Sequence, residues 1–224
     1  MSTKFKYYAK ELLNIALPII MGNLGFILIG AGDVLIAGHH STDTLAAISI
    51  ATAITNCIQT FGIGLIASVS PLLSNYRGEK KSAKKYFFPT IRFSMVLGVI
   101  VMFAVLASIP LIDYLHFEAK LVPMIKEYMF VTAFATFGGY LHAALKEFLQ
   151  AFEIVLFPNL VTVFSVFLNI ALNVTLVFGL GPFPSLGVLG LAVASFIVRY
   201  FNKVAILRKQ TDKEIRERRK YQST

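Results

Sequence analysis

Asp33 is the residue whose position in this sequence points most directly to chemistry. It follows a run from Leu12 to Gly32 without any Asp, Glu, Lys or Arg, and four apolar residues, 34–37, come after it. Carboxylates inside apolar helices are costly, and those that occur usually bind ions or protons. We therefore predict that Asp33 is a buried functional carboxylate. A helix that long measures roughly 30 Å, so solvation at its outer end is the alternative.

Two asparagines are the next candidates. Asn169 and Asn173 lie four residues apart in another uncharged stretch, so in a helix they share one face. Amides at this spacing either hold neighbouring helices together by hydrogen bonds or border an ion site. The two residues alone leave both interpretations open.

Pro18 is a candidate hinge, because it lies well inside the first apolar segment. Proline lacks the amide hydrogen, so the carbonyl of Asn14 loses its helical partner. Glycines at positions 22, 25, 30 and 32 follow on the same segment. This pattern predicts a helix that bends there or packs closely on its neighbours, as small residues in membrane helices often do.

The elements that hold these residues are membrane helices. The 224 residues are 56% hydrophobic and 15% charged, whereas soluble proteins have about 45–50% apolar and about 25% charged residues. Five stretches contain no charged residue, and a spanning helix needs about 20 residues. The last stretch, 154–198, is long enough for two helices and is interrupted by Gly and Pro at 179–184. We predict an all-α integral membrane protein with six transmembrane helices, at about 11–37, 44–73, 89–112, 121–150, 156–179 and 186–207.

The placement of positive charge predicts the orientation of these helices. Lys and Arg are frequent near the N-terminus, at 75–85 and at 199–224, and absent from the connections at 38–43 and 179–185. Cytoplasmic loops are the basic ones, so we expect a multi-pass plasma-membrane protein with both termini in the cytoplasm. Residues 1–207 would form one six-helix unit. We expect 208–224 to be a basic cytoplasmic tail or a truncated linker that attracts anionic lipid and binds no nucleic acid.

Other classes of protein lack support in the sequence. The single Cys57 excludes a disulfide framework and is too little for a zinc site. We find no phosphate-binding glycine loop, no metal-ligand cluster and no catalytic triad, so we expect no enzyme, no metal and no cofactor. An intramembrane serine protease would need a glycine-framed nucleophile, and Ser68 and Ser70 have no such frame.

Six sequence pieces, in the right order, resemble the amino-terminal half of the multidrug and toxic compound extrusion (MATE) family. The resemblance covers residues 10 to about 200. The matching pieces are Ala-Leu-Pro-Ile at 16–19, Asp-Val-Leu-Ile-Ala-Gly at 33–38, Leu-Ala-Ala-Ile at 45–48, Phe-Leu-Gln at 148–150, Leu-Asn-Ile-Ala-Leu-Asn at 168–173 and Leu-Gly-Val-Leu-Gly-Leu-Ala at 186–192.

The resemblance implies one lobe of a two-lobe secondary antiporter that exports small organic cations, including drugs, in exchange for protons or sodium ions. The position of Asp33 would take the coupling ion, Asn169 and Asn173 would line the same pocket, and Pro18 would bend the first helix. Some members have Asp where this sequence has Asn173, so a site with two carboxylates is in doubt.

The resemblance also implies a second six-helix lobe, supplied by a separate chain or by a homodimer. Of the arrangements considered, we expect a truncated or split reading frame. The alternatives from other classes are a flippase for lipid-linked precursors and a non-transporting membrane fragment or scaffold. Such flippases tend to place Arg in the cavity, whereas the cavity-facing segments here are nearly free of Arg.

Overall fold

The part of the chain that the structure describes is almost entirely helical. The computed structural model describes residues 2–79, 83–182 and 184–222, and the side chains only of 5–79, 85–182 and 184–208. No strand occurs within these residues. The elements are α1 (Ser2–His40), α2 (Thr42–Ala67), α3 (Val69–Gly78), the 3-10 turn η1 (Ala83–Tyr86), α4 (Phe87–Ser108), the 3-10 segment η2 (Ile109–Tyr114), α5 (Leu121–Ala151), α6 (Leu156–Phe178) and α7 (Gly187–Gln222).

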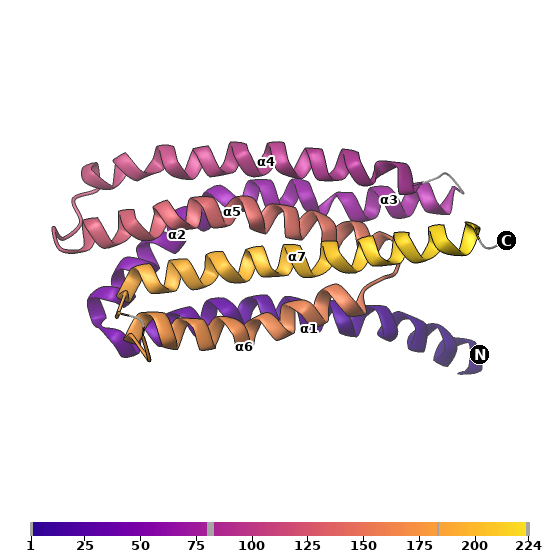
Figure 1. The fold of residues 1–224 in the computed structure, drawn as a ribbon, viewed down its shortest axis with the longest axis horizontal. Coiled ribbons are helices and arrows are strands. Elements are labelled where there is room, and N and C mark those ends of the chain that lie inside the picture. Colours follow the sequence, from indigo (N-terminus) through magenta and orange to yellow (C-terminus); the bar gives the residue numbers. More distant parts are fainter. Residues whose placement is uncertain (1, 80–82, 183, 223–224) are drawn as a thin grey trace.

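The helices lie along one common axis and form a bundle (Figure 1). α1 packs against α6, α6 against α7, α7 against α5, and α5 against α2 and α4. The chain runs back and forth along the bundle, with α2 and α3 together making one passage, so both ends of the described chain lie at the same end (Figure 1). An even number of passages returns the chain to the end of the bundle at which it began.

Two predicted spans are interrupted by proline before they end. The span expected at 44–73 breaks after Ala67 and continues as α3. Pro71 causes this break, because it has no N–H to donate to the carbonyl of Ala67 and its ring clashes with that carbonyl. The span expected at 89–112 stops being α-helical at Ser108. Pro110 lies in the following 3-10 segment, where the N–H of Ile109 bonds to Leu106.

The last predicted span continues beyond its expected end. We placed the end of the sixth helix at 207, whereas α7 continues without a break to Gln222. The backbone of the expected tail, 208–224, is therefore helical as far as it is described. Its charged side chains from 209 on, and residues 223–224 altogether, lie outside the described part, so the lipid-binding role of the tail stays a prediction.

Five of the six helical passages are long and apolar enough to cross a membrane: Phe5–His40, Thr42–Gly78, Phe87–Tyr114, Leu156–Phe178 and Gly187–Arg208. The exception among the described helices is α5, which has 31 residues and runs along the bundle like the others (Figure 1). Because α2, α4 and α7 surround it, α5 buries polar side chains such as Thr132 and Thr136. A helix shielded from lipid need not be apolar on every face.

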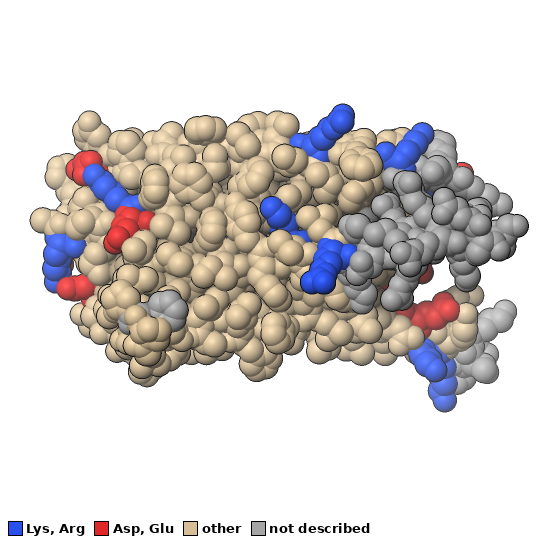
Figure 2. Space-filling view, viewed as in Figure 1, with Lys and Arg blue, Asp and Glu red and all other residues tan. Residues whose placement is uncertain are grey.

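On the face shown in Figure 2, side chains of both signs lie at the left-hand end, an uncharged zone follows, and further positive side chains lie from about the middle of the view to the right. At the end formed by the α1–α2 and α4–α5 connections, Lys120 lies 2.9 Å from Asp43, and Lys126 lies 2.6 Å from Asp113. The hydrogen bond to Asp43 raises the pKa of Lys120. These pairs sit where the membrane–water boundary is expected for spans of this length.

The topology makes a testable prediction about the two ends of α2–α3. In a Cys57→Ser background, His39→Cys and Ser74→Cys place exposed thiols at opposite ends of the bundle. We expect a membrane-impermeant maleimide to label His39→Cys from outside intact cells, and Ser74→Cys only after the cells are opened. Labelling of both cysteines from the same side would contradict the membrane crossing of α2–α3.

Candidate functional site

The carboxylate of Asp33 is the centre of a buried hydrogen-bonded cluster contributed by three helices. Asn173 on α6 donates from Nδ2 to Oδ1 of Asp33 at 2.5 Å, and Ser195 on α7 donates to Oδ2 at 3.3 Å. The same Nδ2 of Asn173 donates to Oδ1 of Asn169 at 3.0 Å. Asp33 is 8% exposed and both asparagines are fully buried. Donation to a carboxylate in such an environment is stronger than between neutral groups.

Close packing of α1 on α6 brings Asp33 to Asn173. Gly22 is the tightest point of this contact, since a Cβ atom there would lie 2.6 Å from Cγ of Asn159 and 2.9 Å from its Cβ. Further along, Gly25 faces the backbone of Val163, and Gly32 faces Ile170. Gly22, Gly25 and Gly32 are spaced by three and seven residues, so they lie on one face of α1. Asp33 follows directly at the end of this face.

The turn between α6 and α7 brings Ser195 to the same carboxylate. Gly179 ends α6 in the left-handed conformation, with φ 72°, which glycine adopts without steric cost. The chain then folds back, and the N–H of Leu186 donates to the carbonyl of Leu176 at 2.9 Å. Gly190 allows α7 to lie against α6, since a Cβ there would be 2.8 Å from the carbonyl carbon of Leu176.

Two polar atoms of the cluster have no hydrogen-bond partner among the described residues, Nδ2 of Asn169 and Oδ1 of Asn173. Leaving a buried donor or acceptor unpaired costs about 1–3 kcal/mol. The cluster therefore keeps one donor and one acceptor available for a change in its hydrogen bonding.

A single guanidinium lies beside the cluster. Arg199 is one helical turn after Ser195 on α7, and it is close enough to Asp33, Tyr128 and Tyr140 to interact with each electrostatically. Its side chain packs over Gly139 of α5, where a Cβ atom would lie 3.5 Å from Cδ of Arg199. Arg199 is thus the exception to our expectation that these helices are nearly free of Arg.

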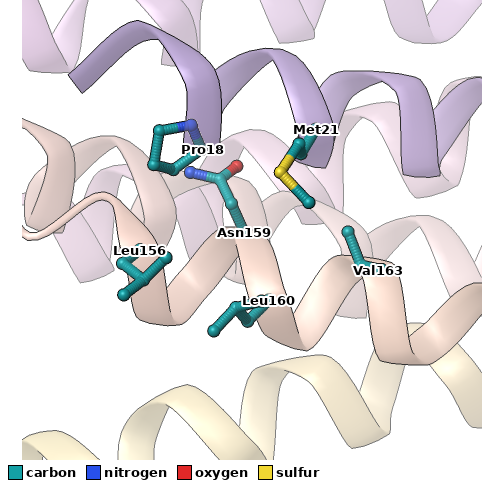
Figure 3. Close-up of a pocket in the computed structure, with 6 residues that line it drawn as sticks. All are labelled: Pro18, Met21, Leu156, Asn159, Leu160 and Val163. Atoms are coloured by element: carbon teal, nitrogen blue, oxygen red, sulfur yellow. The ribbon is translucent and has the colours of Figure 1, made fainter. Parts of the chain in front are cut away.

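Pro18 lies apart from the cluster. It is 15 residues before Asp33, or about 22 Å along α1. Figure 3 shows it beside Asn159 in a small hollow between α1 and α6, lined also by Met21, Leu156, Leu160 and Val163. The Nδ2 of Asn159 donates to the carbonyl of Val155 at 2.6 Å, and its Oδ1 has no partner among the described residues. The predicted hinge therefore lies beside the Gly22–Asn159 contact, at a small hollow between α1 and α6.

The structure brings together Asp33, Asn169 and Asn173, all predicted as one site, and places Pro18 about four turns away. Sequence reasoning missed Ser195, Tyr128 and Arg199. Ser195 and Tyr128 gave no usable sign, because serine and tyrosine are ordinary in membrane helices. The i, i+4 spacing from Ser195 to Arg199, together with the position of Arg199 just after a long charge-free stretch, was the available sign.

Comparison with known proteins identifies relatives of this architecture. The MatE family model matches residues 18–175. The chain is 26% identical to the multidrug resistance protein NorM of Photobacterium profundum over 198 residues, 87% of this chain and 43% of that protein. It is 29% identical to a probable multidrug resistance protein NorM of Rhizobium meliloti, over 82% of this chain and 40% of that protein.

Solved structures give the same fold. A MOP superfamily transporter from Pyrococcus furiosus matches with a TM-score of 0.78 at 20% identity, over 87% of this chain and 43% of that one. The outward-facing conformation of a multidrug resistance MATE family transporter matches with a TM-score of 0.76, also at 20% identity and over the same shares of the two chains. This chain therefore spans less than half the length of the relatives that it matches.

The cluster predicts a stability effect for Asn173. Asn173→Ala removes the donor to Oδ1 of Asp33, so we expect a loss of about 2 kcal/mol of unfolding free energy, as for other hydrogen bonds to charged groups. Asn56→Ala, an exposed asparagine on α2, is the matched control and should change stability little. Denaturant unfolding of the purified chain in detergent measures both. Equal losses for the two variants would show that the hydrogen bond to Asp33 adds no stability.

Proposed function

Since the chain belongs to the MatE family, we propose that it is the amino-terminal lobe of a multidrug efflux antiporter of the plasma membrane. The observation that supports this function is the buried carboxylate of Asp33, held by side chains of α6 and α7. In this proposal Asp33 binds the coupling ion, a proton or a sodium ion. Small organic cations leave the cell in exchange, and the lobe needs no cofactor.

Coupling in this proposal depends on the hydrogen bonds that join α1 to α6 and α7. While Asp33 is ionised, it accepts from Asn173 and Ser195 and fixes α1 against both helices. When an ion occupies the carboxylate, these charge-assisted bonds weaken. α1 is then free to bend at Pro18, where the backbone already lacks one helical hydrogen bond.

Transport in this proposal needs a second lobe. The relatives have more than twice the aligned length, and the two solved structures are described as transporters. Six passages return the chain to its starting side, so two such lobes would be parallel repeats around a shared cavity. We propose that a separate chain or a second copy provides the other lobe, with both termini of this chain in the cytoplasm, as the basic segments favour.

Asp33→Asn tests the coupling role. The amide keeps the shape of the side chain and cannot be ionised, so we expect ion-driven efflux of an organic cation such as ethidium to fall to background in the assembled transporter. Membrane expression should not change. Asp113→Asn, which changes an exposed carboxylate in η2, should leave efflux unchanged at matched expression. Wild-type efflux from Asp33→Asn would refute the mechanism.

Pro18→Ala tests the hinge. Alanine restores the missing backbone hydrogen bond, so α1 should resist bending while the Asp33 cluster, about 22 Å away, stays intact. We expect ion binding near the wild-type level and efflux lowered at least about tenfold, the effect of about 1.4 kcal/mol. The control Pro89→Ala lies in the first turn of α4, where proline costs no hydrogen bond. Equal efflux from the two variants would count against the hinge.

A further inference from the structure

The surroundings of Asp33 are better suited to a proton than to a metal cation. Hard cations are bound by several oxygen atoms, but the two oxygens of Asp33 face a nitrogen donor of Asn173 and the hydroxyl of Ser195. No group of three or more His, Cys, Asp or Glu side chains that would hold a metal ion occurs within the described residues.

The two unpaired atoms of the cluster are the partners that a protonated Asp33 requires. With Asp33 ionised, Nδ2 of Asn173 donates to both Asp33 and Asn169. A protonated Asp33 must instead donate, and it needs an acceptor. If both amides turn by half a rotation, Oδ1 of Asn173 accepts from the new O–H and from Nδ2 of Asn169. These are the two atoms that lack partners now. The turn leaves Nδ2 of Asn173 and Oδ1 of Asn169 without partners instead, so the two protonation states make equally many amide hydrogen bonds without movement of the backbone.

Arg199 supplies a positive charge that is fixed by α7. Among the described residues, no hydrogen bond or ion pair engages its guanidinium, although it interacts electrostatically with Asp33. The other titratable group of the described part that faces Asp33 is the phenol of Tyr128 on α5, and α6 contributes only the two asparagines. With Asp33 ionised, the site therefore has one negative and one positive charge, and its net charge is zero.

We propose that this lobe binds a proton and excludes sodium, and that Arg199 is the residue that sets this selectivity. The proposal rests on the proposed function, since it names the coupling ion of the same site. Arg199 repels both cations. A proton nevertheless binds, because it forms a covalent O–H bond with Asp33 and this O–H donates to Oδ1 of Asn173. Sodium depends wholly on electrostatic attraction, and a site without net negative charge, next to the fixed charge of Arg199, does not supply it.

The proposal predicts that sodium binding appears when the site becomes negative. Arg199→Gln removes a positive charge and Asn173→Asp adds a negative one, so each makes the net charge of the site more negative by one unit. We expect the sodium affinity of both variants to rise at least about tenfold, because a change of one unit charge beside a buried carboxylate has effects of this size or larger. Arg199→Lys keeps the charge and should bind no sodium. Lys203→Gln removes a charge one turn further along α7, where the ammonium lies over Tyr200, and should also bind none.

Thermal unfolding of the full purified chain in detergent provides the first measurement, in about 150 mM sodium chloride or choline chloride. A ligand that binds the folded chain raises its melting temperature. We expect equal melting temperatures in the two salts for wild type, Arg199→Lys and Lys203→Gln, and a higher one in sodium for Arg199→Gln and Asn173→Asp. The two latter variants are independent, so the test survives if one of them fails to fold.

Carbodiimide labelling of Asp33, located by mass spectrometry, provides the second measurement, because the reagent adds to protonated carboxyl groups. In the wild type, we expect labelling that increases as the pH falls and does not respond to sodium. In Arg199→Gln, sodium should protect Asp33. The proposal would be overturned if sodium raised the melting temperature of the wild type or protected its Asp33 from labelling. It would also be overturned if Arg199→Gln and Asn173→Asp both folded and neither responded to sodium. Loss of drug efflux with these sodium responses as expected would instead refute the transport function.

Discussion

The hydrogen bond from Asn173 to Asp33 is the interaction on which the rest of the lobe depends. A carboxylate this deep in an apolar bundle is tolerated only when neighbouring helices supply donors. α6 supplies one at 2.5 Å, and α7 supplies another at 3.3 Å. The small residues along the chain follow from this requirement. Gly22 lets α1 reach α6, and Gly190 lets α7 reach α6. Larger side chains at these contacts would hold the donors away from Asp33.

The interior of the lobe differs on the two sides of Asp33. Toward the α1–α2 connection, Asp33 is followed by a tightly packed apolar cluster that includes Ala37, Ala47, Ile48, Met129 and Leu191. Toward the end that holds both chain termini, polar contacts continue, with Ser165 donating to the buried Asn202 and Lys146 donating to the exposed Asn23. An apolar cluster excludes water and strengthens the hydrogen bonds beside it. Under the proposed function, these polar groups would be partners for an ion that moves between Asp33 and that end of the bundle.

The sequence predicts the helices and the central carboxylate well, because both follow from local patterns. Charge-free stretches of spanning length mark the passages, and Asp33 stands out in one of them. The i, i+4 spacing of Asn169 and Asn173 also predicts their shared face. The sequence alone does not tell which helix this face meets, because that depends on packing between residues about 140 positions apart. Ser195 and Arg199 were missed for the same reason. The breaks at Pro71 and Pro110 follow from local chemistry and were predictable.

The groups around Asp33 that the structure describes all come from this chain. Asn169, Asn173 and Ser195, together with Tyr128 and the guanidinium of Arg199, belong to α5, α6 and α7. Under the proposed function, ion binding is therefore separable from transport, because these groups surround Asp33 without a second lobe. A path for substrate is different, because alternating access needs two bodies that move against each other. Since the chain aligns with 43% of the length of these relatives, under the proposed function it would hold the ion-binding residues and one of the two bodies that such a movement requires.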